Sequence, residues 1–117
     1  MIGVNDLNKR LGATVATSNY DKLFNLIDTR LPDTIVYVQS VLPVNNDWMF
    51  IDNTDIPKLN ADLKKNAEER GYVYIDLHSK FSDSNGLLFK KLSNDGIHLL
   101  GEGYNLWRNQ IDGYVSE

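Results

Sequence analysis

The chain has 117 residues, a length that fits one domain with a single hydrophobic core. Its net charge of −4 at pH 7 comes with no basic stripe, which argues against nucleic acid as a partner. There is no cysteine, so disulfides and thiolate metal sites are excluded, and no apolar run approaches the roughly 20 residues of a membrane span.

The first six residues, Met1 to Asp6, lack the basic and apolar segments of a signal peptide. They read as the end of a strand that enters a polar turn, as if the chain were entered partway through a fold. We therefore expect any export signal to lie upstream, and the sequence leaves the compartment open.

The first helix is predicted to begin near Ser18. Ser18-Asn19-Tyr20-Asp21 resembles a capping box, in which the Ser18 hydroxyl would accept a hydrogen bond from the Asp21 N–H. Pro32 is expected to end this helix. Between these limits the apolar residues at helical spacing are Tyr20, Leu23, Phe24, Ile27 and Leu31.

Two runs, 34–39 and 72–77, are apolar enough to predict buried strands. The first shows no polar alternation, which is typical of a parallel sheet covered by helices on both faces. A polar stretch, 40–55, separates it from a second helix that ends at Gly71. The second helix has an apolar stripe of Ile56, Leu59, Leu63 and Ala67, and its charges, expected to form a solvated face, are Lys64, Lys65, Glu68, Glu69 and Arg70.

The last predicted helix carries an apolar face, on which Tyr104 and Trp107 are expected to lie in the core. The other members of that face are Leu100, Ile111 and Tyr114. Alternation of strands and helices along the chain favours an α/β layer architecture with right-handed crossovers. Because ligands in such sheets bind beyond the carboxyl ends of the strands, residues 3–6, residues 40–55 and the loop before His98 should converge there.

The strongest local pattern is Asp95-Gly96-Ile97-His98. The glycine permits a tight turn, so the Asp95 carboxylate can accept from the Nδ1–H of His98 and leave Nε2 free as a base. Spacing alone favours an ordinary loop before a helix, with Asp95 acting only as a turn or cap residue.

A second pattern, Gly3-x-Asn5-Asp6, stands at the predicted strand end. The Asn5 amide could donate to a developing oxyanion, as side chains of oxyanion holes do. Gly, Asn and Asp are also common turn residues, so this pattern alone favours an ordinary turn.

Taken together, the two patterns resemble two of the four sequence blocks of the SGNH (GDSL-type) serine hydrolases, in that family's order. Residues 40–45 (Ser-Val-Leu-Pro-Val-Asn) resemble a strand-end stretch of its acetylhydrolase-like members. The resemblance implies a flavodoxin-like three-layer sandwich with a parallel sheet. It also implies an esterase, lipase, thioesterase or carbohydrate deacetylase that acts on a small acyl ester and needs no metal or other cofactor.

By this resemblance His98 is the general base, Asp95 orients it, and Asn5 donates to the oxyanion hole. The family's Gly-Asp-Ser block, which holds the nucleophile, and its glycine block are absent from the chain. Ser40 ends a strand but matches a different stretch, so it is not interpreted as the nucleophile. We therefore expect the chain alone to hydrolyse esters weakly or not at all.

Three further side chains, Trp48, Pro43 and His78, lie near the predicted strand ends. Trp48, in an aromatic loop segment, and Pro43 are candidates for a substrate pocket, although aromatic residues could equally anchor that loop. His78 follows a strand and is expected to be a surface or helix-cap residue rather than a second base.

In the family's strand order, 2-1-3-4-5, this chain would form one partial domain, residues 1–117, with strands 3, 4 and 5 and without the first two. Strand 3 would then be an exposed edge. An open edge favours self-association or complementation by an upstream segment. The alternative function is a catalytically inactive α/β interaction module that retains the family blocks.

Overall fold

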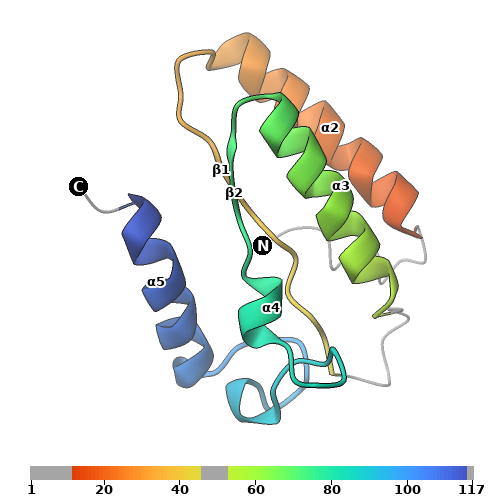
Figure 1. Ribbon diagram of the computed structural model, residues 1–117, viewed down its shortest axis with the longest axis vertical. Helices are drawn as coiled ribbons and strands as arrows, with labels where there is room; N and C mark the ends of the chain where they lie inside the picture. Colours follow the sequence, from red (N-terminus) through yellow and green to blue (C-terminus); the bar gives the residue numbers. More distant parts are fainter. Residues whose placement is uncertain (1–11, 46–52, 116–117) are drawn as a thin grey trace.

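The computed structural model describes residues 12–45 and 53–115 of the chain (Figure 1). Its elements, in order, are α2 (Gly12–Arg30), β1 (Tyr37–Gln39), α3 (Asp55–Glu69), β2 (Val73–Ile75), α4 (His78–Phe81), the 3-10 helix η1 (Lys90–Leu92) and α5 (Gly101–Val115). Among these helices, none is both long enough and apolar enough to cross a membrane.

The two strands are parallel neighbours, with Tyr37 opposite Val73 and Gln39 opposite Ile75. Helix α3 makes the crossover between them, as parallel pairing requires. The predicted parallel α/β arrangement is therefore confirmed for these two strands. The strand expected before Gly3, and the edge that it would form, lie outside the described residues.

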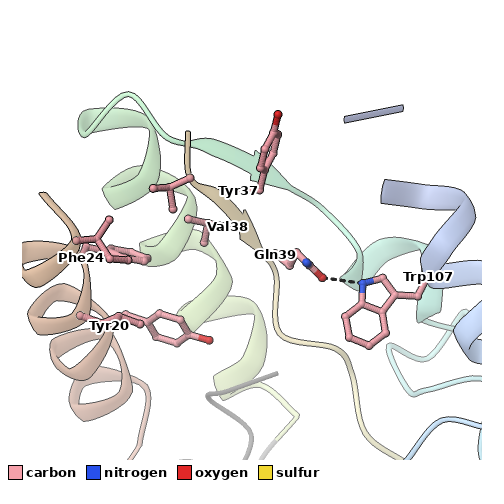
Figure 2. Close-up of a pocket in the computed structure, with 9 residues that line it drawn as sticks. Tyr20, Phe24, Tyr37, Val38, Gln39 and Trp107 are labelled. Atoms are coloured by element: carbon pink, nitrogen blue, oxygen red, sulfur yellow. Dashed lines mark hydrogen bonds between the residues drawn. The ribbon is translucent and has the colours of Figure 1, made fainter. Parts of the chain in front are cut away.

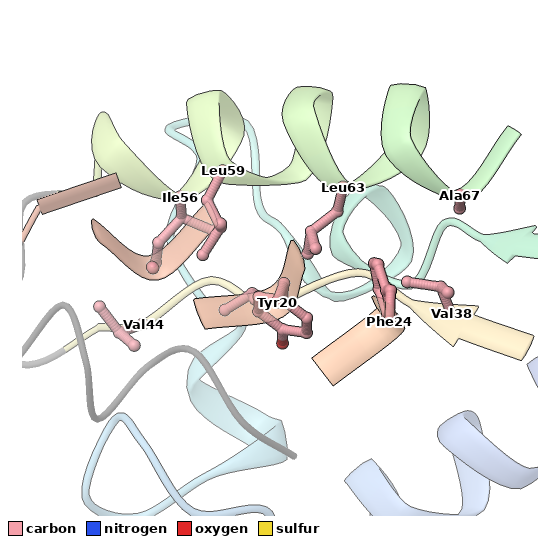
Figure 3. Packing of buried hydrophobic residues seen from close by; sticks show 10 residues of the cluster. Tyr20, Phe24, Val38, Val44, Ile56, Leu59, Leu63 and Ala67 are labelled. Atoms are coloured by element: carbon pink, nitrogen blue, oxygen red, sulfur yellow. The ribbon is translucent and has the colours of Figure 1, made fainter. Parts of the chain in front are cut away.

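Helices cover both faces of the strands. Helices α2 and α3 lie together on one face, and α5 lies on the other (Figure 1). The core under α2 and α3 is aliphatic and aromatic (Figure 3), and its members are Ala16, Tyr20, Phe24, Val38, Val41, Val44, Ile56, Leu59, Leu63 and Ala67. On the other face α5 packs through Leu106, Trp107 and Ile111 against a second cluster centred on Phe81 and Leu88. The result is a three-layer α/β sandwich.

Helix α2 begins at Gly12, earlier than predicted, and the capping box at Ser18 is wrong. The apolar stripe of Tyr20 and Phe24 continues backwards through the buried Ala16 and the partly buried Ala13. Because that stripe packs on α3, the helix extends through Ser18, whose side chain is exposed. The other end agrees with the prediction, since the helix stops at Arg30, two residues before Pro32.

Helix α3 ends as predicted at a glycine with positive φ. Gly71 has a φ of 76° and donates its N–H to the Glu68 carbonyl, while Tyr72 donates to the Ala67 carbonyl. This pair of bonds is a Schellman motif, which satisfies the last carbonyls of the helix. It turns the chain directly into β2.

Residues 41–44 correct the expectation of a polar stretch after β1, because all four are buried. Two asparagines satisfy the backbone polar groups that this burial removes from water. The Asn60 amide bonds both the N–H and the carbonyl of Val41, at 2.7 and 2.9 Å. Asn53 does the same for Val44, at 3.3 and 3.1 Å. The segment thus lies in the core without a partner strand among the described residues, and the two asparagines take the place of strand pairing.

Helix α5 spans Gly101–Val115, close to the predicted range, but its apolar face is only partly buried. The core position predicted for Tyr104 is wrong, since this side chain is 57% exposed. Its ring stacks on Trp107 instead, with centroids 6.0 Å apart. Trp107 is partly buried and packs on the core, as expected.

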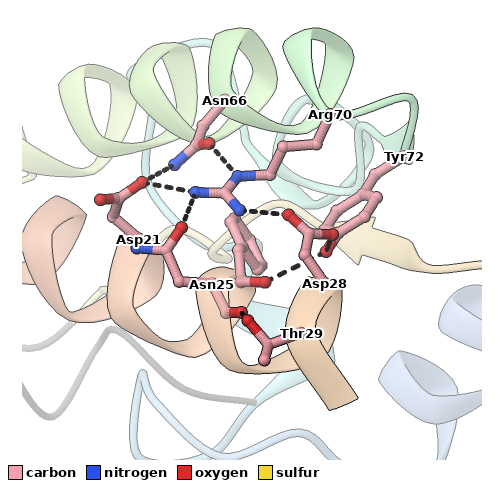
Figure 4. A network of polar contacts seen from close by, with 8 residues as sticks. Asp21, Asn25, Asp28, Thr29, Asn66, Arg70 and Tyr72 are labelled. Carbon is pink, nitrogen blue, oxygen red and sulfur yellow. Dashed lines mark hydrogen bonds and ion pairs between the residues drawn. The ribbon is translucent and has the colours of Figure 1, made fainter. Parts of the chain in front are cut away.

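Arg70, expected on a solvated face, instead joins α3 to α2 (Figure 4). Its guanidinium bonds Asp21 at 2.7 Å and Asp28 at 2.5 Å, and it lies over the ring of Phe24. The Tyr72 hydroxyl also donates to Asp28. Arg70 is thus a tie between helices, and its side chain is only 16% exposed.

Candidate active site

The predicted pair of Asp95 and His98 forms in the structure. The Nδ1 atom of His98 lies 2.6 Å from Oδ2 of Asp95. The other carboxylate oxygen, Oδ1, accepts from the backbone N–H groups of Ile97 at 2.8 Å and His98 at 2.7 Å. The turn between the two residues depends on Gly96, whose φ of 80° lies in the region that favours glycine.

These hydrogen bonds stabilise the charged form of the Asp95 carboxyl. The side chain of His98 has the largest effect, followed by the backbone N–H groups of His98 and Ile97, and together they hold the pKa of Asp95 well below its ordinary value. Asp95 is therefore ionised at neutral pH and can accept the Nδ1–H of His98. That arrangement leaves Nε2 as the acceptor on the ring.

The imidazole faces solvent, with 81% of the His98 side chain exposed. Within residues 12–45 and 53–115, its only side-chain hydrogen bond is to Asp95. The imidazole is thus oriented on one side by Asp95 and open to solvent on the other. A reacting hydroxyl could approach Nε2 without displacing any described side chain.

The turn is joined to the core through the segment that follows β1. The N–H of Asn45 donates to the Gly96 carbonyl at 2.8 Å, and the Asn45 amide donates to the Leu88 carbonyl at 3.2 Å. On the other side, the N–H of Leu100 bonds the Leu92 carbonyl at 2.8 Å, just before α5 begins. The expected convergence of these two segments is therefore present at the Asn45–Gly96 contact.

Ser40 does not act as a nucleophile in this structure. Its hydroxyl is fully buried and accepts from the N–H groups of Leu77 and His78, both at 2.8 Å. His78 begins α4, and burial lowers its pKa. Its Nδ1 atom lies 3.3 Å from the Ser82 hydroxyl. Since His78 is the first residue of α4, the helix-end position expected for it is found.

The other predicted site residues either lie outside the described residues or are buried. Asn5 and Trp48 lie outside the described residues. Pro43 is fully buried inside the chain, so its side chain offers no surface to a ligand in this structure. Of the predicted site residues within 12–45 and 53–115, the structure therefore brings together Asp95 and His98.

A cavity of about 270 Å³ opens beside β1 (Figure 2). Its walls are aromatic and aliphatic side chains of α2, the strand itself and Trp107 of α5. The Trp107 indole N–H donates to Oε1 of Gln39 at 2.7 Å across its floor. The cavity thus adjoins β1 and is lined from α2 on one face and from α5 on the other.

The family model of the GDSL-like Lipase/Acylhydrolase family matches residues 1–106. The chain belongs to this family. The match includes every block on which the sequence resemblance rested, so that resemblance is confirmed at the level of the family.

Solved structures of this family share the fold. One is a protein from Streptococcus pneumonia described as a platelet activating factor, with a TM-score of 0.88 and 25% identity over 97% of this chain. Another is an acylhydrolase from Bacteroides fragilis, with a TM-score of 0.81 and 25% identity over 95% of this chain. The present chain spans 56% of each of those two chains.

Curated relatives from Streptococcus agalactiae carry a different name. The serotype V protein, an N-acylneuraminate cytidylyltransferase, is 31% identical over 99% of this chain. The serotype III protein of the same name is 29% identical. The chain spans only 27% of the length of either relative.

Two residues that hold the turn between Asp95 and His98 were not predicted from the sequence. One is Ser93, whose buried hydroxyl bonds Asp95 and Gly96. Asn45 was read only as part of a family stretch, and it holds the Gly96 carbonyl. The position of Ser93 two residues before Asp95 was the available signal, since serine hydroxyls commonly bond backbone two or three residues ahead. No local signal pointed to Asn45, whose partner lies far along the chain.

Proposed function

We propose that this chain carries the general base and the orienting acid of an acyl-ester hydrolase that works through a serine nucleophile. The supporting observation is the 2.6 Å contact between Nδ1 of His98 and Oδ2 of Asp95, with the rest of the imidazole open. Membership in the GDSL-like acylhydrolase family supplies the reaction class.

In this mechanism Nε2 of His98 takes the proton of a serine hydroxyl as the serine oxygen attacks the ester carbonyl carbon. The carboxylate of Asp95 stabilises the imidazolium that forms. The same proton then passes to the leaving alcohol, and water hydrolyses the acyl-serine by the reverse use of His98. Asn5 is proposed to donate its amide N–H to the oxyanion.

The nucleophile is proposed to come from outside these 117 residues, because no Gly-Asp-Ser occurs in the sequence. The cavity beside β1 offers a place for the segment that brings it. Exposed apolar side chains, Leu23, Leu26 and Ile35, lie on α2 and just before β1. Covering them with further chain would remove apolar surface from water, which favours association.

The relatives suggest which ester to test first. Their name refers to N-acylneuraminate, an acylated sugar acid. Since this chain matches 27% of that protein and belongs to a hydrolase family, cytidylyl transfer is not proposed for it. We propose instead an acyl ester carried on a sugar of that class.

The test compares two proteins, the 117-residue chain and the same chain extended by the coding sequence upstream of Met1. Hydrolysis of p-nitrophenyl acetate and of O-acetylated N-acylneuraminate is followed for both. We expect turnover by the extended protein, loss of it in His98→Ala, and little or none in the short chain. An unchanged rate of ester hydrolysis in His98→Ala, or no hydrolysis by the extended protein, would overturn the proposal; the second outcome would favour a non-catalytic interaction module.

Sedimentation of the short chain tests the association separately. We expect dimers or larger species at micromolar concentration, and a shift to a single complex when the upstream segment is added as a separate polypeptide. A well-folded monomer that ignores the added segment would contradict this part of the proposal.

A further inference from the structure

The hydroxyl of Ser93 occupies the centre of the turn that holds His98. It donates to Oδ1 of Asp95 at 3.1 Å, and it accepts from the N–H groups of Gly96 at 2.9 Å and Asp95 at 3.3 Å. All the bonding capacity of this hydroxyl is therefore used within the turn.

These bonds divide the two oxygens of the Asp95 carboxylate between different tasks. Oδ1 receives the Ser93 hydroxyl together with the backbone N–H groups of Ile97 and His98. With Oδ1 held by three donors, the carboxylate has one rotational setting, in which Oδ2 faces Nδ1 of His98. The direction of the imidazole follows from that setting.

Ser93 is itself held by the core, although His98 is exposed. Its side chain is 7% exposed, and it follows directly after Leu92, a buried residue of the second core cluster. Its backbone is extended, with a φ of −153° and a ψ of 146°. The buried Ser93 thus helps to set, through Asp95, the orientation of the His98 ring, which is itself 81% exposed.

Gly96 is anchored from the opposite direction as well. The Gly96 N–H donates to Ser93, and the Gly96 carbonyl accepts from the N–H of Asn45 at 2.8 Å. Asn45 is tied to Leu88 through its side chain. Gly96 is therefore held through both its N–H and its carbonyl, and of these two bonds only the one to Ser93 uses a side chain.

We propose that Ser93 is a positioning residue for the Asp95–His98 pair: its hydroxyl sets the carboxylate so that the proton of the neutral imidazole stays on Nδ1 and Nε2 stays an acceptor. This inference rests on the proposed function, because the Nδ1–H form is the one that a general base requires. Ser93 does not touch the substrate and acts through Asp95.

The first experiment reads the tautomer directly and needs no catalysis. The 15N shifts of the His98 ring are measured in the 117-residue chain at a pH at which the ring is neutral. We expect the Nδ1–H form to dominate, and its population to fall in Ser93→Ala. Ser93→Thr should restore it, because a β-branched residue tolerates the extended backbone and keeps the hydroxyl.

Two comparisons separate positioning from general loss of structure. Ser84→Ala removes a hydroxyl from an exposed loop position and should leave the His98 tautomer unchanged. If Ser93→Ala does not fold, Ser93→Cys keeps nearly the same volume with a much weaker hydrogen-bonding group, and the same shift is expected. An unchanged tautomer in whichever of the two variants folds would overturn the proposal.

Kinetics of the extended protein give the second readout. Ser93→Ala should lower kcat/KM by about three- to tenfold, as expected for one hydrogen bond, mainly through kcat, and Ser93→Thr should recover it. A tautomer shift without any esterase activity in the parent would leave Ser93 as a positioning residue and refute the proposed function. Activity that depends on His98, together with a tautomer that does not change in Ser93→Ala, would support the proposed function and refute the positioning role of Ser93.

Discussion

Two hydrogen-bond networks built around aspartate differ in how far along the chain their members lie. In the turn before α5, the partners of Asp95 are two or three residues away. Between α2 and α3, Arg70 reaches Asp28 and Asp21, which lie 42 and 49 residues away. The first network orients a single exposed ring, whereas the second fastens two helices together (Figure 4).

The local network and the long-range network also differ in how much each adds to the stability of the fold. Asp95 is 37% exposed and His98 is 81% exposed, so water competes for their bonds and the contact adds little to stability. Arg70 is 16% exposed and also lies over Phe24 in the main core cluster. We therefore expect the local network to control chemistry and the long-range network to control folding.

Asp95→Asn should produce the largest effect, on activity alone. An Asn amide in place of Oδ2 would donate to Nδ1, which moves the ring proton to Nε2 and removes the base. By analogy with serine hydrolases of the triad type, kcat/KM of the extended protein should fall by about a thousandfold or more. The urea midpoint should change little, because an amide oxygen can still accept from Ile97 and His98.

The comparison fails if Asp95→Asn unfolds the chain, or if it leaves ester hydrolysis intact. Asp83→Asn is a suitable control, because Asp83 also accepts local backbone bonds, from Asn85 and Leu87, but lies in a different turn. This control should leave kcat/KM unchanged.

Arg70→Ala should lower the free energy of unfolding by about 2 kcal/mol, the range typical of a partly buried, charge-assisted network. Arg70→Lys should recover only part of this loss, since a lysine cannot present the fork that reaches both Asp21 and Asp28. Urea denaturation measures both. Lys64→Ala, an exposed charge on the same helix, is the control and should have little effect.

Tyr72→Phe should have the smallest effect, visible as a change in pH dependence. The hydrogen bond from Tyr72, with a further contribution from Arg70, lowers the pKa of Asp28 below its ordinary value. A carboxyl with a lowered pKa in the folded state adds stability above its ordinary pKa and loses it as the pH falls through the lowered one. Below about pH 4 the urea midpoint should therefore drop less steeply in Tyr72→Phe than in the original chain.

Tyr104→Phe serves as the matched control for this measurement, because that hydroxyl is on the exposed side of α5. An equal change in acid sensitivity for both variants would mean that Tyr72 has no specific influence on Asp28.

The elements of the fold were largely predictable because their determinants are local. The stripe of Ile56, Leu59 and Leu63, and the glycine that stops α3, indicate the helix whatever lies around it. The beginning of α2 was not predictable in the same way. A local capping pattern at Ser18 competes there with burial of Ala16, and packing against α3 prevails.

Burial of residues 41–44 was hidden from the sequence for a related reason. A run that leaves a strand and leads toward polar residues has no periodicity that indicates a core position. Its burial depends on Asn60 and Asn53, which bond its backbone from α3 and from just before it. Asparagine at those positions looks in the sequence like any solvent-exposed polar residue.

By itself the sequence determined the family, the parallel α/β class and the pairing of Asp95 with His98, because each depends on motif order or on residues a few positions apart. Only the tertiary structure decided the bridge made by Arg70, the burial of Pro43 and the anchoring of Gly96 by Asn45. A contact across 40 or more residues forms only when packing of the core has brought its partners together, and no local pattern encodes that packing. The turn from Asp95 to His98 is therefore a local structure that is anchored by a residue from a distant part of the chain, Asn45.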